Sequence, residues 1–155
     1  MSKSLKRVAR FLQEAGHENT IIEAGETRTA EQAAAACGCQ IDQIVKSIIF
    51  RGDASGQIRL FLTAGGNRIC AEKASALAQE PLGRADANLV RATTGFAIGG
   101  VAPVAHLTPS PTWIDPRLTE FDLVWAAAGT PRHVFSIDPQ ALISLASATL
   151  ADFVE

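Results

Sequence analysis

The sequence predicts one domain of mixed α/β architecture, with short helices and strands interleaved around a mixed β-sheet. Three observations support this prediction. The length of 155 residues suits a single hydrophobic core. Segments with helical and with strand periodicity alternate along the chain, and turn residues separate them. We see no repeat, low-complexity tract or linker, so residues 1–155 are expected to form one domain.

The N-terminal elements are predicted from spacing and capping. Apolar residues at helical intervals predict a helix over residues 5–12, and β-branched residues predict a short strand over 20–23. Thr29 with Gln32 three positions later forms the capping-box pattern. It should open an alanine-rich helix that ends near Gly38.

A β-hairpin is predicted next. Residues 44–51 and 58–63 have strand character, and the turn-rich segment 52–56 joins them. Further helices are expected over residues 72–79 and 139–145, and a short one is expected to run from an Asp86 cap to residues 93–94. Further strands are expected over residues 112–115, 123–126 and 133–137. Residues 95–106 form an apolar segment interrupted by glycines.

Composition excludes several classes of protein. No stretch reaches the roughly 18–20 apolar residues needed to span a bilayer, and no apolar signal region follows the basic N-terminus. We therefore expect a soluble, cytoplasmic protein without a membrane partner. The net charge of −2 argues against a generic DNA or RNA coat protein, although it allows an enzyme that grips only the end of a nucleic acid.

Metal and covalent chemistry find no support. The cysteines are odd in number and lack a zinc-ligand pattern, so we expect ordinary small apolar residues in a reducing compartment: Cys37, Cys39 and Cys70. The three histidines lack metal-ligand spacing, and neither a Ser-His-Asp pattern nor a G-x-S-x-G elbow can be placed. We expect neither a metal nor an organic cofactor.

Lys46 is the most informative single residue. The two-residue period of a strand places Ile44, Lys46, Ile48 and Phe50 on one face. A lysine on an apolar face must reach water, a partner or a ligand, because an unpaired buried ammonium is costly. The strand alone allows two interpretations: a ligand-binding lysine, or a charge that discourages edge pairing.

Two loops could assist such a site. Gly99-Gly100, with Pro103 beyond, could turn backbone N–H groups toward an ester carbonyl or a phosphate, and Gly100 could require close backbone approach and positive φ. An ordinary turn is the alternative. The segment from Gly129 to His133 supplies a tight turn with a hydroxyl, a cation and an imidazole, or a plain hairpin connection.

Four stretches of the chain carry a family resemblance: TAEQAA (29–34), QIVKS (43–47), TGFAIGGVAPVAH (94–106) and WAAAGTPRHVF (125–135). Taken in this order, they resemble the YbaK / prolyl-tRNA-synthetase-associated editing-domain family. The agreement in order and spacing runs from about residue 20 to the C-terminus. It implies a compact mixed sheet, partly barrel-like, with helices packed around it.

The resemblance also implies hydrolysis of mischarged aminoacyl-tRNA, most often tRNA for proline carrying a small amino acid such as alanine, cysteine, serine or 2-aminobutyrate. The acceptor end of the tRNA is the implied partner, and prolyl-tRNA synthetase is a candidate second partner. The family's important lysine falls on Lys46 and its substrate loop on Gly99, Gly100 and Pro103. Residues expected to bind the substrate are Ile48, Phe50, Phe96, Ile98, Val101, Pro103, His106, Gly129, Thr130 and His133.

These residues predict a mechanism. Lys46 and backbone N–H groups around Gly99–Val101 would stabilise the oxyanion, and a hydroxyl of the terminal ribose would help to position the water, as the family implies. A small pocket would refuse proline sterically, with Ile48, Phe50, Phe96 and Ile98 as candidate wall residues.

Two points bear on specificity and binding. Many relatives have proline and glycine where this chain has Ala102 and Ala105, and the methyl group of Ala105 is expected either to narrow the pocket or to restrict its backbone. The cations expected to meet phosphates are Lys46, Arg68, Lys73 and Arg132. Two other functions stay open: a non-catalytic module that binds aminoacyl-tRNA or a synthetase, and a hydrolase or binder of a small nucleotide.

Overall fold

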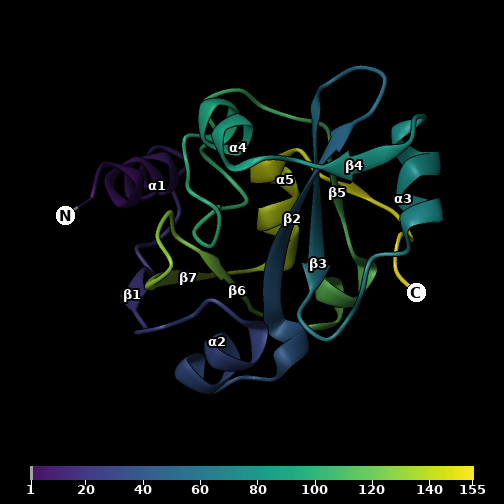
Figure 1. The fold of residues 1–155 in the computed structure, drawn as a ribbon. Coiled ribbons are helices and arrows are strands. Elements are labelled where there is room, and N and C mark those ends of the chain that lie inside the picture. The colour runs from purple at the N-terminus through teal and green to yellow at the C-terminus, as the bar shows by residue number, and fades with distance from the viewer. Residues whose placement is uncertain (1) are drawn as a thin grey trace.

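The computed structural model describes residues 2–155, which form five α-helices, two short 3-10 helices and eight strands of one sheet (Figure 1). The helices are α1 (Lys3–Glu14), α2 (Ala30–Cys37), η1 (Ile41–Gln43), α3 (Ala71–Ala78), α4 (Ala87–Thr94), η2 (Pro116–Glu120) and α5 (Pro139–Ala146). The strands are β1 (Ile22–Glu23), β2 (Ile44–Gly52), β3 (Ile58–Ala64), β4 (Leu82–Arg84), β5 (Thr112–Ile114), β6 (Val124–Ala127), β7 (His133–Ile137) and β8 (Thr149–Leu150). No helix within residues 2–155 combines the length and apolar character needed to cross a membrane.

The sheet is mixed, as predicted, and its order is β1-β7-β6-β2-β3-β5-β8, with β4 also paired to β2. The predicted hairpin is confirmed: β2 and β3 pair antiparallel from Val45 opposite Ala64 to Arg51 opposite Ile58. β6 joins β2 in parallel, and β5 joins β3 in parallel. Over the described residues this order ends at β1 and β8 without closing into a barrel.

Local signals explain the helix boundaries. The capping box of α2 is confirmed, because the Thr29 hydroxyl accepts from the Gln32 N–H at 3.1 Å and Gln32 Oε1 accepts from the Thr29 N–H at 3.2 Å. Gly38 ends that helix with φ +66°, a left-handed conformation that suits glycine. The Asp86 carboxylate caps α4 by accepting from the Leu89 N–H at 2.8 Å.

The faces of β2 contact different apolar clusters. Val45 and Ile49 pack into the main core, which α1, α4 and α5 cover. Ile44 packs against Ala33 and Ala34 of α2, whereas Ile48 and Phe50 pack in an aromatic cluster around Phe61 and Phe153. Ile48 and Phe50 therefore lie on the face opposite to Val45 and Ile49, as the predicted two-residue period requires.

Candidate functional site

A gap in the sheet positions the candidate site. One edge of β2 pairs with β3 along its length, but the other pairs with β6 at residues 44–45 and with β4 at residues 50–52. Residues 46–49 thus have no strand partner on that edge among the described residues. The N–H of Gly52 donates to Gln57 O and therefore points toward the β3 edge of β2. Successive residues of a strand direct their N–H and C=O groups to alternate edges, so the main-chain groups of Ser47 and Ile49 point into the gap.

A cavity of about 530 Å³ lies at this gap. Its lining comes from segments far apart in the sequence: Thr27–Ala30 and Ala33, Ile44–Ile49, Arg84, Ala85 and Val90, Ile98, Gly99 and Val101, Trp125–Ala127, and Val134. The buried members are apolar and form the floor, for example Val45, Ala85, Val90 and Val134. Exposed members, including Arg28 and Arg84, form the rim.

Lys46 reaches this cavity from β2. Its ammonium donates to the main-chain carbonyl of Asn67 at 2.6 Å, and no carboxylate within residues 2–155 forms an ion pair with it. Burial lowers the pKa of Lys46 from its ordinary value, and the nearby Glu31 carboxylate opposes that shift only in part. Both interpretations of Lys46 fit this position, because it lines a cavity and also lies on an unpaired strand edge.

The two adjacent glycines have different surroundings. Gly99 lines the cavity with φ +96°. The expected close approach is found at Gly100, where an added Cβ would lie 2.8 Å from the main chain of Thr130. The expectation of positive φ at Gly100 was wrong, because the turn places it at Gly99. The Gly100 N–H donates within the loop to Ala97 O at 3.0 Å, which leaves the N–H groups of Gly99 and Val101 as candidate oxyanion donors.

The structure brings together some of the predicted substrate-binding residues. Ile48, Ile98 and Val101 line the cavity with Lys46 and Gly99. Ile98 is 61 % exposed, which places it at the mouth. Phe50 and Phe96 lie outside the lining, because the first belongs to the aromatic cluster and the second is fully buried in the main core.

The residues after Val101 line a different cavity. Pro103, Ala105 and His106 lie around a space of about 370 Å³ between α1, α5 and the loop that contains them. His106 Nε2 lies 2.6 Å from Ala102 O and donates to it, because a carbonyl oxygen only accepts, and burial holds the pKa of this imidazole below its ordinary value. Ala105 does not line the Lys46 cavity, so the expectation that its methyl group narrows the pocket is wrong for that cavity. The alternative expectation, that the methyl group restricts the backbone, fits the left-handed φ of +64°, a conformation that favours glycine.

The predicted loop of residues 129–133 packs against the loop that contains Gly99 and Gly100. Gly129 has φ +98°, and an added Cβ would lie 2.8 Å from Ser4 O of α1. Thr130 contacts Gly100 through its main chain, and its hydroxyl lies 2.7 Å from Nδ1 of His133. Gly129, Thr130 and His133 are absent from the lining of the 530 Å³ cavity among the described residues.

Sequence reasoning missed the rim and part of the floor. Arg28 lies one residue before the α2 cap, and Arg84 ends a three-residue strand, β4, that we did not predict. Trp125 lies in the quoted segment 125–135, where its pairing opposite Ile44 brings it to the cavity. The pairing of β2 with β6 is parallel and joins residues 81 positions apart (125 − 44), so no local pattern reveals it.

The cysteines are free and half-buried. Burial, with the neighbouring Cys39, raises the pKa of Cys37 to about 11, so its thiol is protonated at neutral pH. Within the part of the chain that the structure describes, no three His, Cys, Asp or Glu side chains are grouped as metal ligands would be.

Comparisons with known proteins agree with this geometry. Residues 24–145 match the aminoacyl-tRNA editing domain. A crystal structure of a proposed trans-editing enzyme for prolyl-tRNA synthetase is 43 % identical, with a TM-score of 0.92 over 100 % of this chain and 99 % of that one. The uncharacterized protein YwhH of Bacillus subtilis (strain 168) is 30 % identical over 90 % of this chain and 88 % of its own length.

A more distant relative bears a name related to function. It is a proposed Cys-tRNA(Pro)/Cys-tRNA(Cys) deacylase, EbsC, of Enterococcus faecalis (strain ATCC 700802 / V583), 21 % identical over 80 % of this chain and 76 % of that protein. The segment that matches the editing-domain family contains Lys46, the gap in the sheet, the loop of Gly99 and Gly100, and the 129–133 loop that packs against it. The chain therefore belongs to the aminoacyl-tRNA editing domain family.

Proposed function

We propose that this protein hydrolyses the ester bond of mischarged aminoacyl-tRNA as a trans-acting deacylase. The observation that carries the proposal is the cavity at the sheet gap, which combines a buried apolar floor with a cationic rim. An amino acid esterified to the end of a tRNA has matching parts: a small side chain on one side and phosphates on the other.

The chemistry requires few protein groups, because an aminoacyl ester is already activated. Water adds to the carbonyl carbon, and the resulting oxyanion collapses as the ribose oxygen leaves, which releases the free amino acid and the tRNA. Lys46 uses one N–H on Asn67 O and has two further donors for the oxyanion or a phosphate. The N–H groups of Gly99 and Val101 are the proposed additional donors, each worth roughly 3–4 kcal/mol in a comparable acyl-transfer site. A hydroxyl of the terminal ribose is proposed to position the water.

The rim suggests how the tRNA end is held. Arg28, Lys46 and Arg84 line the cavity, and no Asp or Glu within residues 2–155 does so. Two cations predicted to meet phosphates are engaged elsewhere. Lys73 pairs with Asp152 at 2.9 Å, and Arg132 lies 3.6 Å from carboxylates of Glu23 and Glu26. We assign phosphate contact to Arg28 and Arg84 because these two arginines line the cavity, whereas Lys73 and Arg132 do not; the exposed Arg28 side chain also pairs with Glu26 at 3.3 Å.

The floor suggests selection by size. It consists of small and medium side chains from several elements, including Val45, Ala85, Val101 and Ala126. Such a floor can accept alanine, serine, cysteine or 2-aminobutyrate and refuse the proline ring sterically, whereas rewarding one extra methylene yields only about 1–3 kcal/mol. The 43 % identity to a proposed trans-editing enzyme for prolyl-tRNA synthetase supports tRNA for proline as the carrier and that synthetase as a partner.

The test is a panel of tRNAs charged with alanine, serine, cysteine, 2-aminobutyrate and proline. We expect rapid release of one or more small amino acids from tRNA for proline and no release of proline. Lys46→Ala serves as the control for contaminating hydrolases. Tight binding of charged tRNA without hydrolysis would instead identify a non-catalytic module, and hydrolysis of free nucleotides alone would identify a different hydrolase.

A further inference from the structure

A polar network behind the cavity fixes the loop to which Lys46 is bonded. Asn67, whose carbonyl accepts from the Lys46 ammonium, lies in residues 65–68 between β3 and α3. This loop turns sharply, since the Asn67 N–H donates to Ala64 O at 2.9 Å. The direction of the ammonium therefore depends on a loop carbonyl and on whatever positions that loop.

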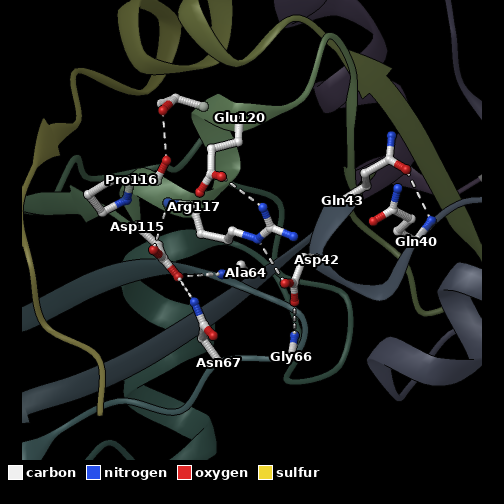
Figure 2. Close-up of polar contacts among 11 residues, drawn as sticks. Gln40, Asp42, Gln43, Ala64, Gly66, Asn67, Asp115, Pro116, Arg117 and Glu120 are labelled. Carbon is white, nitrogen blue, oxygen red and sulfur yellow. Dashed lines mark hydrogen bonds and ion pairs between the residues drawn. The ribbon is translucent and has the colours of Figure 1, made fainter.

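Asp115 holds the loop from the end of β5. This carboxylate is only 2 % exposed and accepts three hydrogen bonds. Its Oδ2 accepts from the Ala64 N–H at 3.1 Å and from Asn67 Nδ2 at 2.9 Å, and its Oδ1 accepts from the Arg117 N–H at 2.9 Å. Figure 2 shows Asp115 between Ala64, Asn67 and Arg117. A buried charge with this many donors is restricted to one position.

Asp42 holds the same loop at Gly66, the residue before Asn67 (Figure 2). Its carboxylate accepts from the Gly66 N–H at 2.8 Å and from Arg117 Nε at 2.9 Å, so Arg117 links the two carboxylates. Packing leaves little freedom, because a Cβ at Gly66 would lie 2.5 Å from Asp42 Oδ1, and one at Gly65 would clash with Ile41 O. The loop is thus fixed by contacts with two separate segments, residues 41–42 and 115–117.

We infer that Asp115 and the Asn67 amide are positioning residues, which hold the carbonyl of Asn67 and thereby the Lys46 ammonium at the cavity. This inference rests on the proposed function for its catalytic meaning, but the positioning is measurable without substrate. A small displacement matters at such a site, because a shift of about 1 Å in a positioned group can cost on the order of 10²-fold in rate.

The first measurement is amine labelling of the free protein. The chain has four lysines, Lys3, Lys6, Lys46 and Lys73, so acetylation by acetic anhydride can be followed at each by mass spectrometry. In Asp115→Asn and Asn67→Ala the Lys46 amine should be labelled about five- to tenfold faster than in the parent, with the other lysines as internal references, because loss of a charge-assisted hydrogen bond releases the amine. Asn67→Ala keeps the carbonyl and removes one partly exposed amide, so it should fold even if Asp115→Asn does not.

The pH dependence of labelling gives a second signature. The charged groups near Lys46 are Glu31 of α2, Asp42 of η1, Arg68 of the loop and Asp115 after β5. Removing the negative charge of Asp115 should lower the pKa of Lys46 further, because less charge then stabilises the ammonium. Asn67→Ala leaves these four charges in place. Labelling of Lys46 should therefore be faster in this variant without the fall in the pKa of Lys46 that is expected for Asp115→Asn.

The second measurement is single-turnover deacylation. Both variants should lower the rate constant about 10- to 100-fold while KM changes little. The control is Asp138→Ala, which removes the N-cap of the distant α5 and should lower stability without altering the rate of the folded protein. Folded variants that label Lys46 at the parent rate, or that slow no more than Asp138→Ala, would overturn the positioning role. A parent without deacylase activity would refute the proposed function, while labelling would still decide the positioning.

Discussion

Replacing Gly100 with alanine should disturb the candidate site through a single contact. The added Cβ would lie 2.8 Å from Cα and from the carbonyl carbon of Thr130. These are main-chain atoms, so no side-chain rotation relieves the contact. Ordinary van der Waals contact begins near 3.4 Å, so the glycine loop and the 129–133 loop must separate by about 0.6 Å (3.4 − 2.8).

The magnitude follows from this displacement. Inserting a methyl group into a packed contact typically costs about 1–3 kcal/mol, and 1 kcal/mol lowers Tm by about 2–4 °C in a chain of this size. We therefore expect Tm to fall by roughly 2–12 °C. A shift of about 0.6 Å in the loop that contains Gly99 and Val101 should slow deacylation on the order of tenfold, because about 1 Å can cost 10²-fold.

The assay pairs a melting curve with single-turnover hydrolysis of alanyl-tRNA for proline. Gly16→Ala is the matched control, because Gly16 also has a constrained conformation, with φ +77° and no atom of the described residues within 4 Å of an added Cβ. It lies after α1, away from the cavity, so it should lower Tm and leave the rate of the folded protein unchanged. A Gly100→Ala variant with the parent's Tm and rate would refute the importance of the Thr130 contact.

The remaining predictions concern charge and specificity. Lys46→Met should abolish deacylation but melt at the same or a slightly higher temperature, because burial of the ammonium opposes folding below its pKa; a large fall in Tm would indicate a structural role. In the parent, the rate should decline at a lower alkaline pH than an ordinary lysine would give, since desolvation lowers the pKa of Lys46, and a pH–rate profile tests this. Ala105→Gly should leave the ratio of alanyl to 2-aminobutyryl hydrolysis unchanged, because residue 105 lines the other cavity, and a changed ratio would contradict that assignment. Arg28→Gln and Arg84→Gln should each weaken tRNA binding and reduce the slope of log Kd against log salt by about 1, as measured by titration at several salt concentrations.

Much of the fold could be predicted because its signals are local. The cap at Thr29, the turn at residues 52–56 and the alternation along β2 each involve neighbours in sequence. β4 and β8 were missed because strands of three and two residues are too short to display a period. The half-exposed β8 is positioned by pairing with β5, so its own residues contain no strand pattern.

The candidate site divides in the same way. Lys46 could be found because a charge on an apolar strand face is a local anomaly. The surroundings of Phe50 and Phe96 could not be predicted, because the pattern of apolar residues assigns a side chain to a face of its element without revealing what covers that face. Phe61 and Phe153 cover Phe50, and Arg7 lies 4.4 Å above the Phe96 ring. At Ala105 the sequence left two alternatives open, a narrowed pocket or a restricted backbone, and only the structure chooses the left-handed backbone between them.

The gap in the sheet unites the two interpretations that the sequence left open for Lys46. A strand edge with free main-chain groups invites pairing with another chain, and natural proteins counter this with short exposed edges and with lysines. Here the open edge is limited to residues 46–49, because β6 and β4 cover the positions on either side. Lys46 places its charge beside that opening, and the cavity lies in the same space. The feature that leaves the edge unpaired also creates room for a ligand, so protection of the edge and binding of a substrate are compatible roles for one side chain. Strand pairing elsewhere fixes the main chain of Ser47 and Ile49, and a ligand in the cavity would meet these groups already oriented.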